Sequence, residues 1–380
     1  MTPGPTPPPP SQDAFYRAPK HLDSLTPGTV IRTRQVSIPG IDRSKLAVAK
    51  TVLFVSTDIN DNNIAASETL LTPAANWPGA QARPMLAVQQ TYDSLGTACE
   101  PSYTLRVGGK ASQDDVSVLN NLLAGGSEVV VPDYEGPTAL FTIGDQEGRI
   151  VLDGIRAAES TGAGGINAAT RVASFGYSGG GQATAWGAEL QPSYAPGINL
   201  VGAAEGGVPA DMKETLGRLD GGPNAFLAVM SLVAIGRAYP DLGLNHLLTS
   251  AGKKLVTNVA TTCGDLTLRS DLEGTRLDSL VTVPSLLAYR PLQPILAALQ
   301  LGQHAPSAPI YNFHGTADEI VGFAADRKLV QYYCSQNVTV DFAPIQNAKH
   351  LEAYYQGIAG VASWLIDRLN GKPAPNNCQG

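Results

Sequence analysis

The chain has 380 residues, enough to bury a large core and to hold either one large α/β domain with insertions or two ordinary domains. Hydrophobic residues make up 43% and charged residues 16%, which is typical of a globular protein, and 40 glycines with 28 prolines predict many loops and turns. The formal net charge is -7 and lysine and arginine form no cluster, which argues against nucleic acid as a partner and against an anionic membrane surface held by basic residues.

The chain begins with a proline-rich arm. Residues 1–12, MTPGPTPPPPSQ, are expected to be disordered or extended. They contain no apolar run and so resemble neither a signal peptide nor a membrane anchor, and we expect that a signal was removed before this numbering begins. No stretch of the sequence has the uninterrupted apolar length of a transmembrane helix, so we expect no transmembrane segment.

The first half of the chain alternates strand and helix signals. Residues 30–38 and 46–56 are rich in β-formers, and the alternation in the first of them predicts an antiparallel hairpin. A helix over 146–159 carries its apolar residues on one stripe and precedes the next strand. Strand, helix, strand, helix in this order predicts an α/β fold with a doubly wound, mostly parallel sheet. Further strands are expected at 66–72, 85–90 and 127–132, and a further helix at 116–124.

The central motif is a serine at a sharp turn. Residues 172–175 form a short apolar strand, residues 182–190 are rich in helix formers, and Ser178 lies between them within Gly-Tyr-Ser-Gly-Gly. This is the G-x-S-x-G pattern of a nucleophile elbow, in which small neighbours let strand and helix pass close together. The pattern also occurs in structural turns, and the flanking strand and helix favour the catalytic interpretation. Ser178 is therefore the expected nucleophile, and the backbone N–H of Gly179 is one expected oxyanion donor.

A long connection follows the elbow. Strands are expected at 198–203 and 309–313, about a hundred residues apart, and a minimal α/β unit needs no connection of that length. We expect a helical cap or lid at 211–305, between two parts of the core at 13–210 and 306–380, over the sheet edge where ligands bind. The alternative is a second compact domain with no contact to the site. Four apolar side chains either line an acyl tunnel or form the core of the cap: Phe226, Met230, Leu232 and Leu286.

The acid of a hydrolase is expected just beyond the cap. Asp318 follows the strand at 309–313, where such a sheet presents the carboxylate that orients an imidazole. Glu319 is a neighbour that can substitute for it in principle. Asp326 is interpreted instead as a surface residue of a helix at 324–333.

The base is expected at His350, in a loop between a strand at 338–342 and the last helix. The order Ser178, Asp318, His350 is the serine, acid, histidine order of α/β-hydrolases. In this interpretation Ser178 attacks an acyl carbonyl, His350 moves its proton to the leaving alcohol, and Asp318 fixes the imidazole tautomer. A second oxyanion donor is expected near Asp93, in the loop after the third core strand. The other histidines are interpreted as structural or surface residues: His21, His246, His304 and His314.

The four cysteines are dispersed and never spaced as C-x-x-C. This pattern argues against a metal site and favours two disulfides, with three connectivities open, in an oxidising compartment. We expect no metal and no cofactor. Asn337 begins an Asn-Val-Thr sequon and is a candidate glycosylation site. The cysteines are Cys99, Cys263, Cys334 and Cys378.

Ordered sequence matches to one family extend over most of the chain. They begin at Phe15-Tyr16-Arg17-Ala18-Pro19 and end at Pro375 and Cys378. Between these lie Asp93 with Cys99, Asp133-Tyr134-Glu135-Gly136, Leu152-Asp153-Gly154-Ile155-Arg156-Ala157, Gly176-Tyr177-Ser178-Gly179-Gly180, Gly206-Gly207-Val208-Pro209, Asp318-Glu319-Ile320-Val321 and His350-Leu351. On these residues the chain resembles the secretory lipases of the Candida antarctica lipase A type.

The resemblance implies a secreted enzyme with an α/β-hydrolase fold that hydrolyses acylglycerols, with acyl transfer to alcohols as a further reaction. It places the catalytic triad on Ser178, Asp318 and His350. A charged carboxylate would oppose an oxyanion, so Asp93 is expected to donate through its backbone N–H or a protonated side chain. We expect a monomer that acts on ester or lipid substrates at a lipid–water interface. The resemblance also implies an oxyanion hole at Asp93 and Gly179, a helical lid roughly over 211–305, and disulfides from Cys99 to Cys263 and from Cys334 to Cys378.

One departure from the family pattern bears on the substrate. That pattern continues past the last cysteine into a flap over the site, whereas this chain stops at Gly380, so we expect a more open site suited to shorter or bulkier esters. The first alternative is therefore a carboxylesterase without interfacial activation that acts on short-chain or bulky soluble esters. The second is a non-catalytic hydrolase-fold protein that binds lipid or a partner. A peptidase is disfavoured because nothing resembles a propeller or an acidic clamp for a peptide N-terminus.

Overall fold

The computed structural model describes residues 6–108 and 113–378. Residues 1–5 of the predicted arm lie outside the described residues. The part of the arm that is described is not simply extended, because Pro10–Gln12 forms a 3-10 helix and Pro10 is buried. The proline ring fixes the backbone angle that the first helical position needs, which allows a short helix in this proline-rich segment.

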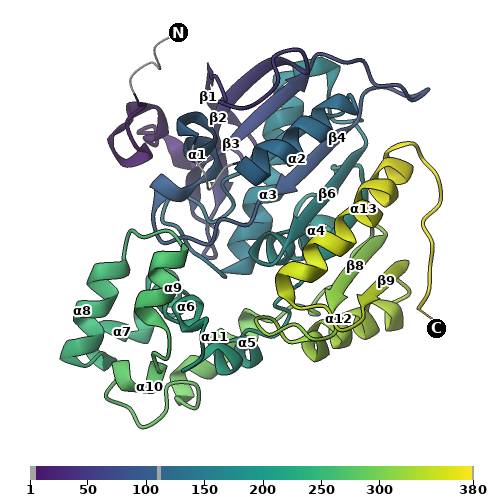
Figure 1. Ribbon diagram of the computed structural model, residues 1–380. Coiled ribbons are helices and arrows are strands. Elements are labelled where there is room, and N and C mark those ends of the chain that lie inside the picture. The colour runs from purple at the N-terminus through teal and green to yellow at the C-terminus, as the bar shows by residue number, and fades with distance from the viewer. Residues whose placement is uncertain (1–5, 109–112, 379–380) are drawn as a thin grey trace.

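A single mixed sheet crosses the molecule (Figure 1). Within the described residues it has nine strands: β1 (Val30–Gln35), β2 (Leu46–Thr57), β3 (Asn63–Pro73), β4 (Met85–Gln89), β5 (Glu128–Pro132), β6 (Val172–Tyr177), β7 (Leu200–Gly206), β8 (Ile310–Gly315) and β9 (Val340–Ile345). Their order is β1-β2-β3-β5-β4-β6-β7-β8-β9.

The sheet is antiparallel at one side and parallel over the rest. The pairs β1–β2, β2–β3 and β3–β5 are antiparallel, which confirms the predicted hairpin of the first two strands. From β5 through β4 to β9 every pair is parallel. The mostly parallel, doubly wound sheet predicted from the alternation of strands and helices is therefore confirmed. Because the parallel strands end at the same edge, the loops after β4, β6, β8 and β9 meet there.

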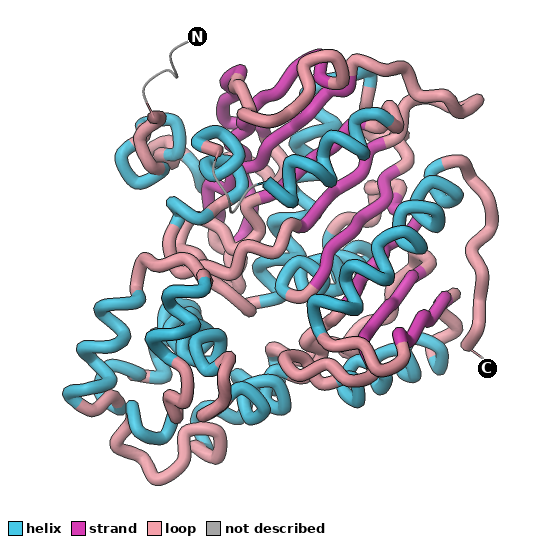
Figure 2. Tube along the Cα trace, in the orientation of Figure 1, coloured by secondary structure: helices cyan, strands magenta, loops and turns pink. Residues whose placement is uncertain are grey.

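Helices cover both faces of the sheet (Figure 2). Met85 and Ala87 of β4 belong to the apolar core shared with one group of helices, and the alternate residues Leu86 and Val88 belong to the core shared with the other group. This alternation is the two-residue repeat of a strand buried on both faces. The first group is α3 (Gly144–Thr161), α4 (Gly179–Tyr194) and α12 (Phe323–Ser335), and the second is α1 (Pro101–Val107), α2 (Gln113–Ala124) and α13 (His350–Leu369).

A helical insertion, residues 212–298, separates β7 from β8. It lies to one side of the sheet (Figure 1), and its apolar core also includes Leu95, Leu140, Phe141 and Ile143 from the first part of the chain. The side chains Phe226, Met230, Leu232 and Leu286 all belong to that core. The insertion contains α5 (Met212–Leu219), α6 (Ala225–Ala238), α7 (Leu244–Leu247), α8 (Ser250–Val259), α9 (Leu266–Leu272), α10 (Leu277–Leu280) and α11 (Gln293–Ala298).

Most of the described helices are shorter than a membrane span. Over the part of the chain that the structure describes, no single helix has the length and apolar composition to cross a membrane. Two consecutive helical segments, Ala225–Ala238 and Pro240–Leu247, reach that length and composition only when taken together, and the chain bends by 103° between them.

Candidate active site

Ser178 occupies the turn between β6 and α4. Its backbone has φ 57° and ψ -122°, a conformation that is strained for a residue with a side chain. A Cβ on Gly176 would lie 2.0 Å from the carbonyl oxygen of Gly180, and one on Gly180 would lie 2.0 Å from that of Gln89. Only glycine fits at these two positions, so strand and helix approach closely and Ser178 stands at the carboxyl edge of the sheet.

Three side chains from distant parts of the chain meet at this turn. His350 Nε2 lies 2.9 Å from the Ser178 hydroxyl oxygen, and His350 Nδ1 lies 2.6 Å from Asp318 Oδ2. With the proton on Nδ1 facing the carboxylate, Nε2 is free to accept the serine proton. The structure thus brings together the residues that the sequence predicts as nucleophile, base and acid.

Asp318 is held through both of its carboxylate oxygens. Oδ1 accepts the backbone N–H groups of Ile320, at 2.9 Å, and Val321, at 2.8 Å. Oδ2 faces His350 and also lies 3.2 Å from His314 Nε2. Burial alone would raise the pKa of Asp318, but the hydrogen bonds from His314 and His350 hold this pKa well below its usual range. At neutral pH Asp318 is therefore an ionised acceptor.

The local structure at His350 differs from the prediction. The sequence predicts a loop, but His350 is the first residue of α13, and Lys349 is the N-cap. The helix begins here because the side chain of Glu352 accepts the backbone N–H of Lys349 at 3.0 Å, which caps the first turn. The imidazole is therefore anchored by a helix rather than carried by a loop.

Two side chains without a predicted supporting role hold the backbone of His350. The hydroxyl of Tyr177 donates to the His350 carbonyl oxygen at 2.6 Å, and the His350 backbone N–H donates to Glu319 Oε2 at 3.1 Å. Tyr177 also packs on the imidazole, with the ring centroids 5.0 Å apart. The only sequence signal for Tyr177 is its place beside Ser178 in the motif. Glu319 supports the base and does not replace Asp318 as its acid partner.

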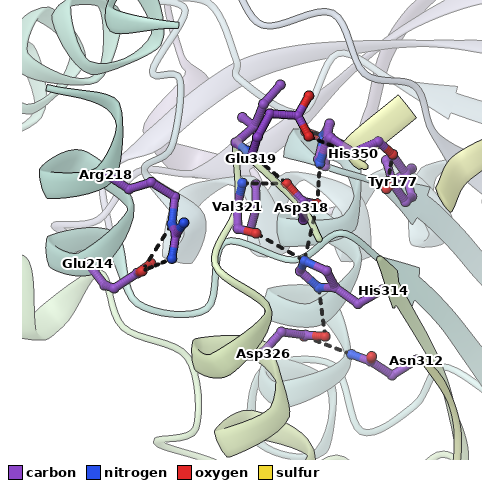
Figure 3. A network of polar contacts seen from close by, with 12 residues as sticks. Tyr177, Glu214, Arg218, Asn312, His314, Asp318, Glu319, Val321, Asp326 and His350 are labelled. Carbon is purple, nitrogen blue, oxygen red and sulfur yellow. Dashed lines mark hydrogen bonds and ion pairs between the residues drawn. The ribbon is translucent and has the colours of Figure 1, made fainter. Parts of the chain in front are cut away.

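A second buried histidine and carboxylate lie behind Asp318 (Figure 3). The prediction that Asp326 is a surface residue is wrong, because α12 turns this side chain toward β8 and buries it completely. Asp326 Oδ2 lies 2.9 Å from His314 Nδ1, and Asp326 Oδ1 accepts a hydrogen bond from Asn312 at 2.9 Å. Burial would lower the pKa of His314, but Asp326 and Asp318 raise it to about 10.

Asp93 lies on the other side of Ser178, in the loop after β4. It has φ 30°, and among the described residues its Oδ1 has no hydrogen-bond partner although it is buried. Oδ1 lies 2.7 Å from the position that a Cβ on Gly179 would occupy, so the carboxyl group faces the start of α4. Burial raises the pKa of Asp93 to about 6, against the opposing effects of His350 and of its own backbone N–H.

The loop that carries Asp93 is tied down on both sides. The backbone N–H and the hydroxyl of Ser94 donate to the carboxylate of Glu135, at 3.0 and 2.6 Å. The carbonyl oxygen of Asp93 accepts the backbone N–H of Gly264, at 2.8 Å, from the insertion. The contacts of Glu135 and Gly264 thus hold this loop in place, and neither residue is predicted as part of the site from the sequence.

A small cavity of about 30 Å³ lies beside Ser178. The insertion supplies part of its wall, so the interpretation of the insertion as a domain without contact to the site is wrong. The four apolar side chains predicted for a tunnel or a cap core are not among the residues that line this cavity, and Leu227 and Ser231 of α6 face it instead. Its lining includes Asp93, Phe141, Gly179, Met212, Thr215 and Leu219.

Two disulfides connect segments that are distant in the sequence. Cys99 pairs with Cys263, which joins the region after β4 to the insertion, and Cys334 pairs with Cys378, which joins the end of α12 to the C-terminal segment. Asn337 is exposed in the turn before β9. Within residues 6–108 and 113–378, no group of three or more histidine, cysteine or acidic side chains is arranged to hold a metal ion.

Comparison with known proteins gives consistent matches along the chain. Residues 103–377 match the family described as secretory lipase. A secreted triacylglycerol lipase of Malassezia globosa is 32% identical over 388 residues, covering 98% of this chain and 84% of that lipase. A Mycobacterium tuberculosis protein named a probable inactive lipase is 30% identical over 374 residues, covering 96% of this chain and 83% of that protein.

A solved structure agrees with these sequence matches. Candida antarctica lipase A in its closed state has a TM-score of 0.91 to this chain at 26% identity, covering 98% of this chain and 90% of that one. Together with the order and direction of the strands, this similarity confirms the predicted α/β-hydrolase fold.

Proposed function

This chain belongs to the secretory lipase family, and on that premise we propose that it is a serine-dependent lipase that hydrolyses acylglycerols and related carboxylic esters. The observation that supports this most directly is the continuous line of contacts from the Ser178 hydroxyl through His350 to Asp318, 2.9 and 2.6 Å long. A non-catalytic lipid-binding protein has no need of this arrangement. Because one relative is named a probable inactive lipase, membership of the family does not by itself imply activity. The contacts among the three side chains therefore carry the proposal.

The reaction proceeds through an acyl-enzyme. As the Ser178 oxygen attacks the ester carbonyl, its proton moves to His350 Nε2, and the imidazolium that forms is stabilised by Asp318. When the tetrahedral intermediate collapses, the ester C–O bond breaks and His350 gives the proton to the leaving alcohol. Water then attacks the carbonyl of the acyl-enzyme while His350 takes a proton from it. The ester bond to Ser178 breaks, His350 returns the proton to the Ser178 oxygen, and the fatty acid leaves. An alcohol in place of water gives acyl transfer.

The negative charge of the tetrahedral intermediate is stabilised at the start of α4. The backbone N–H of Gly179 is at the first position of the helix, where the helix dipole favours an anion. Asp93 supplies a second donor through a protonated carboxyl group, since its Oδ1 is buried, unpartnered among the described residues and directed toward Gly179. A raised pKa keeps this proton in place up to about pH 6.

The helical insertion acts as a lid. A cavity of about 30 Å³ cannot hold an acyl chain, because pockets for small ligands measure roughly 300–1,000 Å³. Helices α5 and α6 supply side chains to its wall, so a displacement of these helices would enlarge the cavity. Leu351 and Tyr355, 62% and 64% exposed, lie one turn apart on α13 beside His350. They offer an apolar surface for contact with a lipid–water interface.

The alternative function is a carboxylesterase that acts on short-chain or bulky soluble esters without an interface. The small cavity favours only its short-chain substrates, because the insertion as it lies leaves no room for a long acyl chain or a bulky ester. The more open site expected from the sequence is not what the structure has. We further propose that the protein is secreted and monomeric and that Asn337 accepts a glycan. Two disulfides suit an oxidising compartment, and the exposed asparagine suits an acceptor site.

The experiment that tests the proposal compares rates on short-chain and long-chain acyl esters, below and above their solubility limits. A lipase is expected to turn over emulsified long-chain triacylglycerol with a rise in rate when the substrate forms an interface. A rate that saturates below the solubility limit, with no turnover of long chains, identifies the carboxylesterase. Turnover of none of these esters contradicts both functions.

A further inference from the structure

His314 contacts the same carboxylate oxygen that orients the catalytic imidazole. It lies on β8 and is fully buried, four residues before Asp318. Its Nε2 is 3.2 Å from Asp318 Oδ2, and His350 Nδ1 is 2.6 Å from that same oxygen. One carboxylate oxygen therefore receives two imidazoles from two different elements (Figure 3).

The partners of His314 determine how many protons its ring carries. Nε2 faces Asp318 Oδ2 and the carbonyl oxygen of Val321, each at 3.2 Å, and Nδ1 faces Asp326 Oδ2 at 2.9 Å. A carbonyl oxygen and an ionised carboxylate can only accept hydrogen bonds. A neutral imidazole would direct the lone pair of one nitrogen at an acceptor, so both nitrogens carry a proton. The raised pKa of His314, about 10, agrees with this geometry.

Asp326 keeps its position because a second strand residue holds it. Asn312 donates to Asp326 Oδ1 at 2.9 Å and to Glu205 Oε1 at 3.2 Å. Phe323 covers the imidazole of His314 edge-on, with the ring centroids 5.8 Å apart. The imidazolium is therefore enclosed by one aromatic ring and two carboxylates, with a low local dielectric in which each charge acts strongly on its neighbours.

We propose that His314 is a positioning residue of the triad, a buried imidazolium that fixes Asp318 Oδ2 for His350 and partly offsets the negative charge of that carboxylate. The inference rests on the proposed function, in which His350 must take a proton from Ser178 and then release it. A lone carboxylate binds that proton tightly, and a positive charge beside it favours release to the leaving alcohol.

The pH dependence of catalysis follows from the charges around His314. Loss of the positive charge leaves the triad carboxylate uncompensated, so a proton binds the triad more tightly and the active form appears at higher pH. Two titratable groups face His314 directly, Asp318 after β8 and Asp326 of α12. Two more face it indirectly: His350 of α13 through Asp318, and Glu205 of β7 through Asn312 and Asp326.

The first experiment measures pH profiles of kcat and kcat/KM for H314Q, whose amide can still donate to Asp318 without a charge. We expect kcat to fall by roughly 10- to 100-fold with KM nearly unchanged, and the acidic limb of the kcat/KM profile to move upward by about one pH unit. A profile whose acidic limb stays in place overturns the proposal. If H314Q does not fold because Asp326 is left unpaired, the double variant H314Q/D326N removes both charges together and carries the same expectation.

A matched control separates positioning from ordinary destabilisation. Asp153 is also fully buried and accepts hydrogen bonds from Ser56 at 2.8 Å and Tyr194 at 2.7 Å, with Arg156 as its ion-pair partner. None of these groups touches the triad. D153N is expected to lower stability while leaving the acidic limb where it is in the wild type. An equal displacement of the limb in D153N overturns the assignment to His314.

The second experiment does not depend on activity. In protein labelled with ¹⁵N-histidine, both ring nitrogens of His314 are expected to show the imidazolium signature from pH 6 to pH 9, with H314Q identifying the resonances. A neutral tautomer of His314 at pH 7.5 overturns the proposal even if the enzyme hydrolyses esters. Conversely, absent ester turnover with a charged His314 refutes the proposed function and leaves the charge assignment standing.

Discussion

The two sides of Ser178 are built in opposite ways. On the base side both carboxylate oxygens of Asp318 have hydrogen-bond partners, and His350 is held through its backbone N–H, its carbonyl oxygen and both ring nitrogens. On the oxyanion side Asp93 Oδ1 is buried and has no partner among the described residues. In the proposed mechanism, the groups that transfer the proton are thus fixed in advance, and the group that meets a charge only in the transition state has no partner in the described part of the resting site.

The two sides also differ in the pKa of their aspartates. On the base side, hydrogen bonds from histidines keep the pKa of Asp318 low. On the oxyanion side, burial outweighs the opposing effects of His350 and of the Asp93 backbone N–H and raises the pKa of Asp93 to about 6. In the proposed mechanism, these different surroundings give the two aspartates near Ser178 an acceptor role and a donor role. Variants of Ser178, of the two aspartates and of their neighbours test this difference between the two sides.

The largest effect is expected for S178A, which removes the nucleophile that both sides serve. We expect kcat for an ester substrate to fall by roughly 10⁵- to 10⁶-fold. The thermal unfolding profile should stay close to that of the wild type, because the substitution removes one hydroxyl at a turn that the neighbouring glycines define. Turnover within tenfold of the wild type would show that Ser178 is not the nucleophile.

A loss of about 10⁴-fold in kcat is expected for D318N. The amide cannot act as an ionised acceptor, so the imidazole of His350 is no longer held in the tautomer that accepts from Ser178. E319Q is the matched control, since the amide oxygen still accepts the His350 backbone N–H, and its kcat should change by less than about tenfold. Equal losses in the two variants would contradict the choice of Asp318 over Glu319.

On the oxyanion side, D93A is expected to lower kcat by roughly 10²- to 10³-fold. D93N retains a donor and should lose less. Because the carboxyl group donates only while protonated, the ratio of wild-type to D93N activity should decline as pH rises through about 6. A ratio that is constant from pH 5 to pH 8 would assign the donor to the backbone N–H.

The smallest effect is expected on the pH dependence of stability. The pKa of His314 is about 10 in the folded chain, against an ordinary value near 6.5, so its stabilisation is complete below about pH 6.5 and is lost as pH rises to about 10. The free energy of unfolding of the wild type should therefore decline relative to H314Q by roughly 1 kcal/mol per pH unit over this interval. Urea unfolding at pH 6.5, 8 and 9.5 measures the difference. Parallel curves for the two proteins would contradict a charged His314.

Most of the fold follows from short patterns in the sequence. The apolar runs, the glycines after helices and the strand–turn–helix around Ser178 predicted the order of the core elements, because these features are local. The three proposed triad residues were predicted from their chain order together with the positions of Asp318 and His350 after strands. The start of α13 at His350 was missed because it depends on the Glu352 side chain reaching back to Lys349, a capping interaction with an unusual N-cap residue.

The surroundings of the site could not be predicted in the same way. Asp326 has the sequence context of a surface helix, and only the packing of α12 against β8 buries it beside His314. Tyr177 meets His350, 173 residues away, through a backbone carbonyl that any residue would provide. The size of the cavity depends on how the insertion lies over Ser178, which has no local signal. These are tertiary contacts between positions whose residue types are individually unremarkable.

The central claim is that Ser178, activated by His350 and Asp318, forms a covalent acyl intermediate. Its most direct test is intact-protein mass spectrometry after exposure to a serine-directed alkyl phosphonate, followed by peptide mapping. The account predicts one adduct per chain on the peptide that contains Ser178, none in S178A, and slow labelling in H350A. An adduct on another residue, or full labelling of S178A, would contradict it.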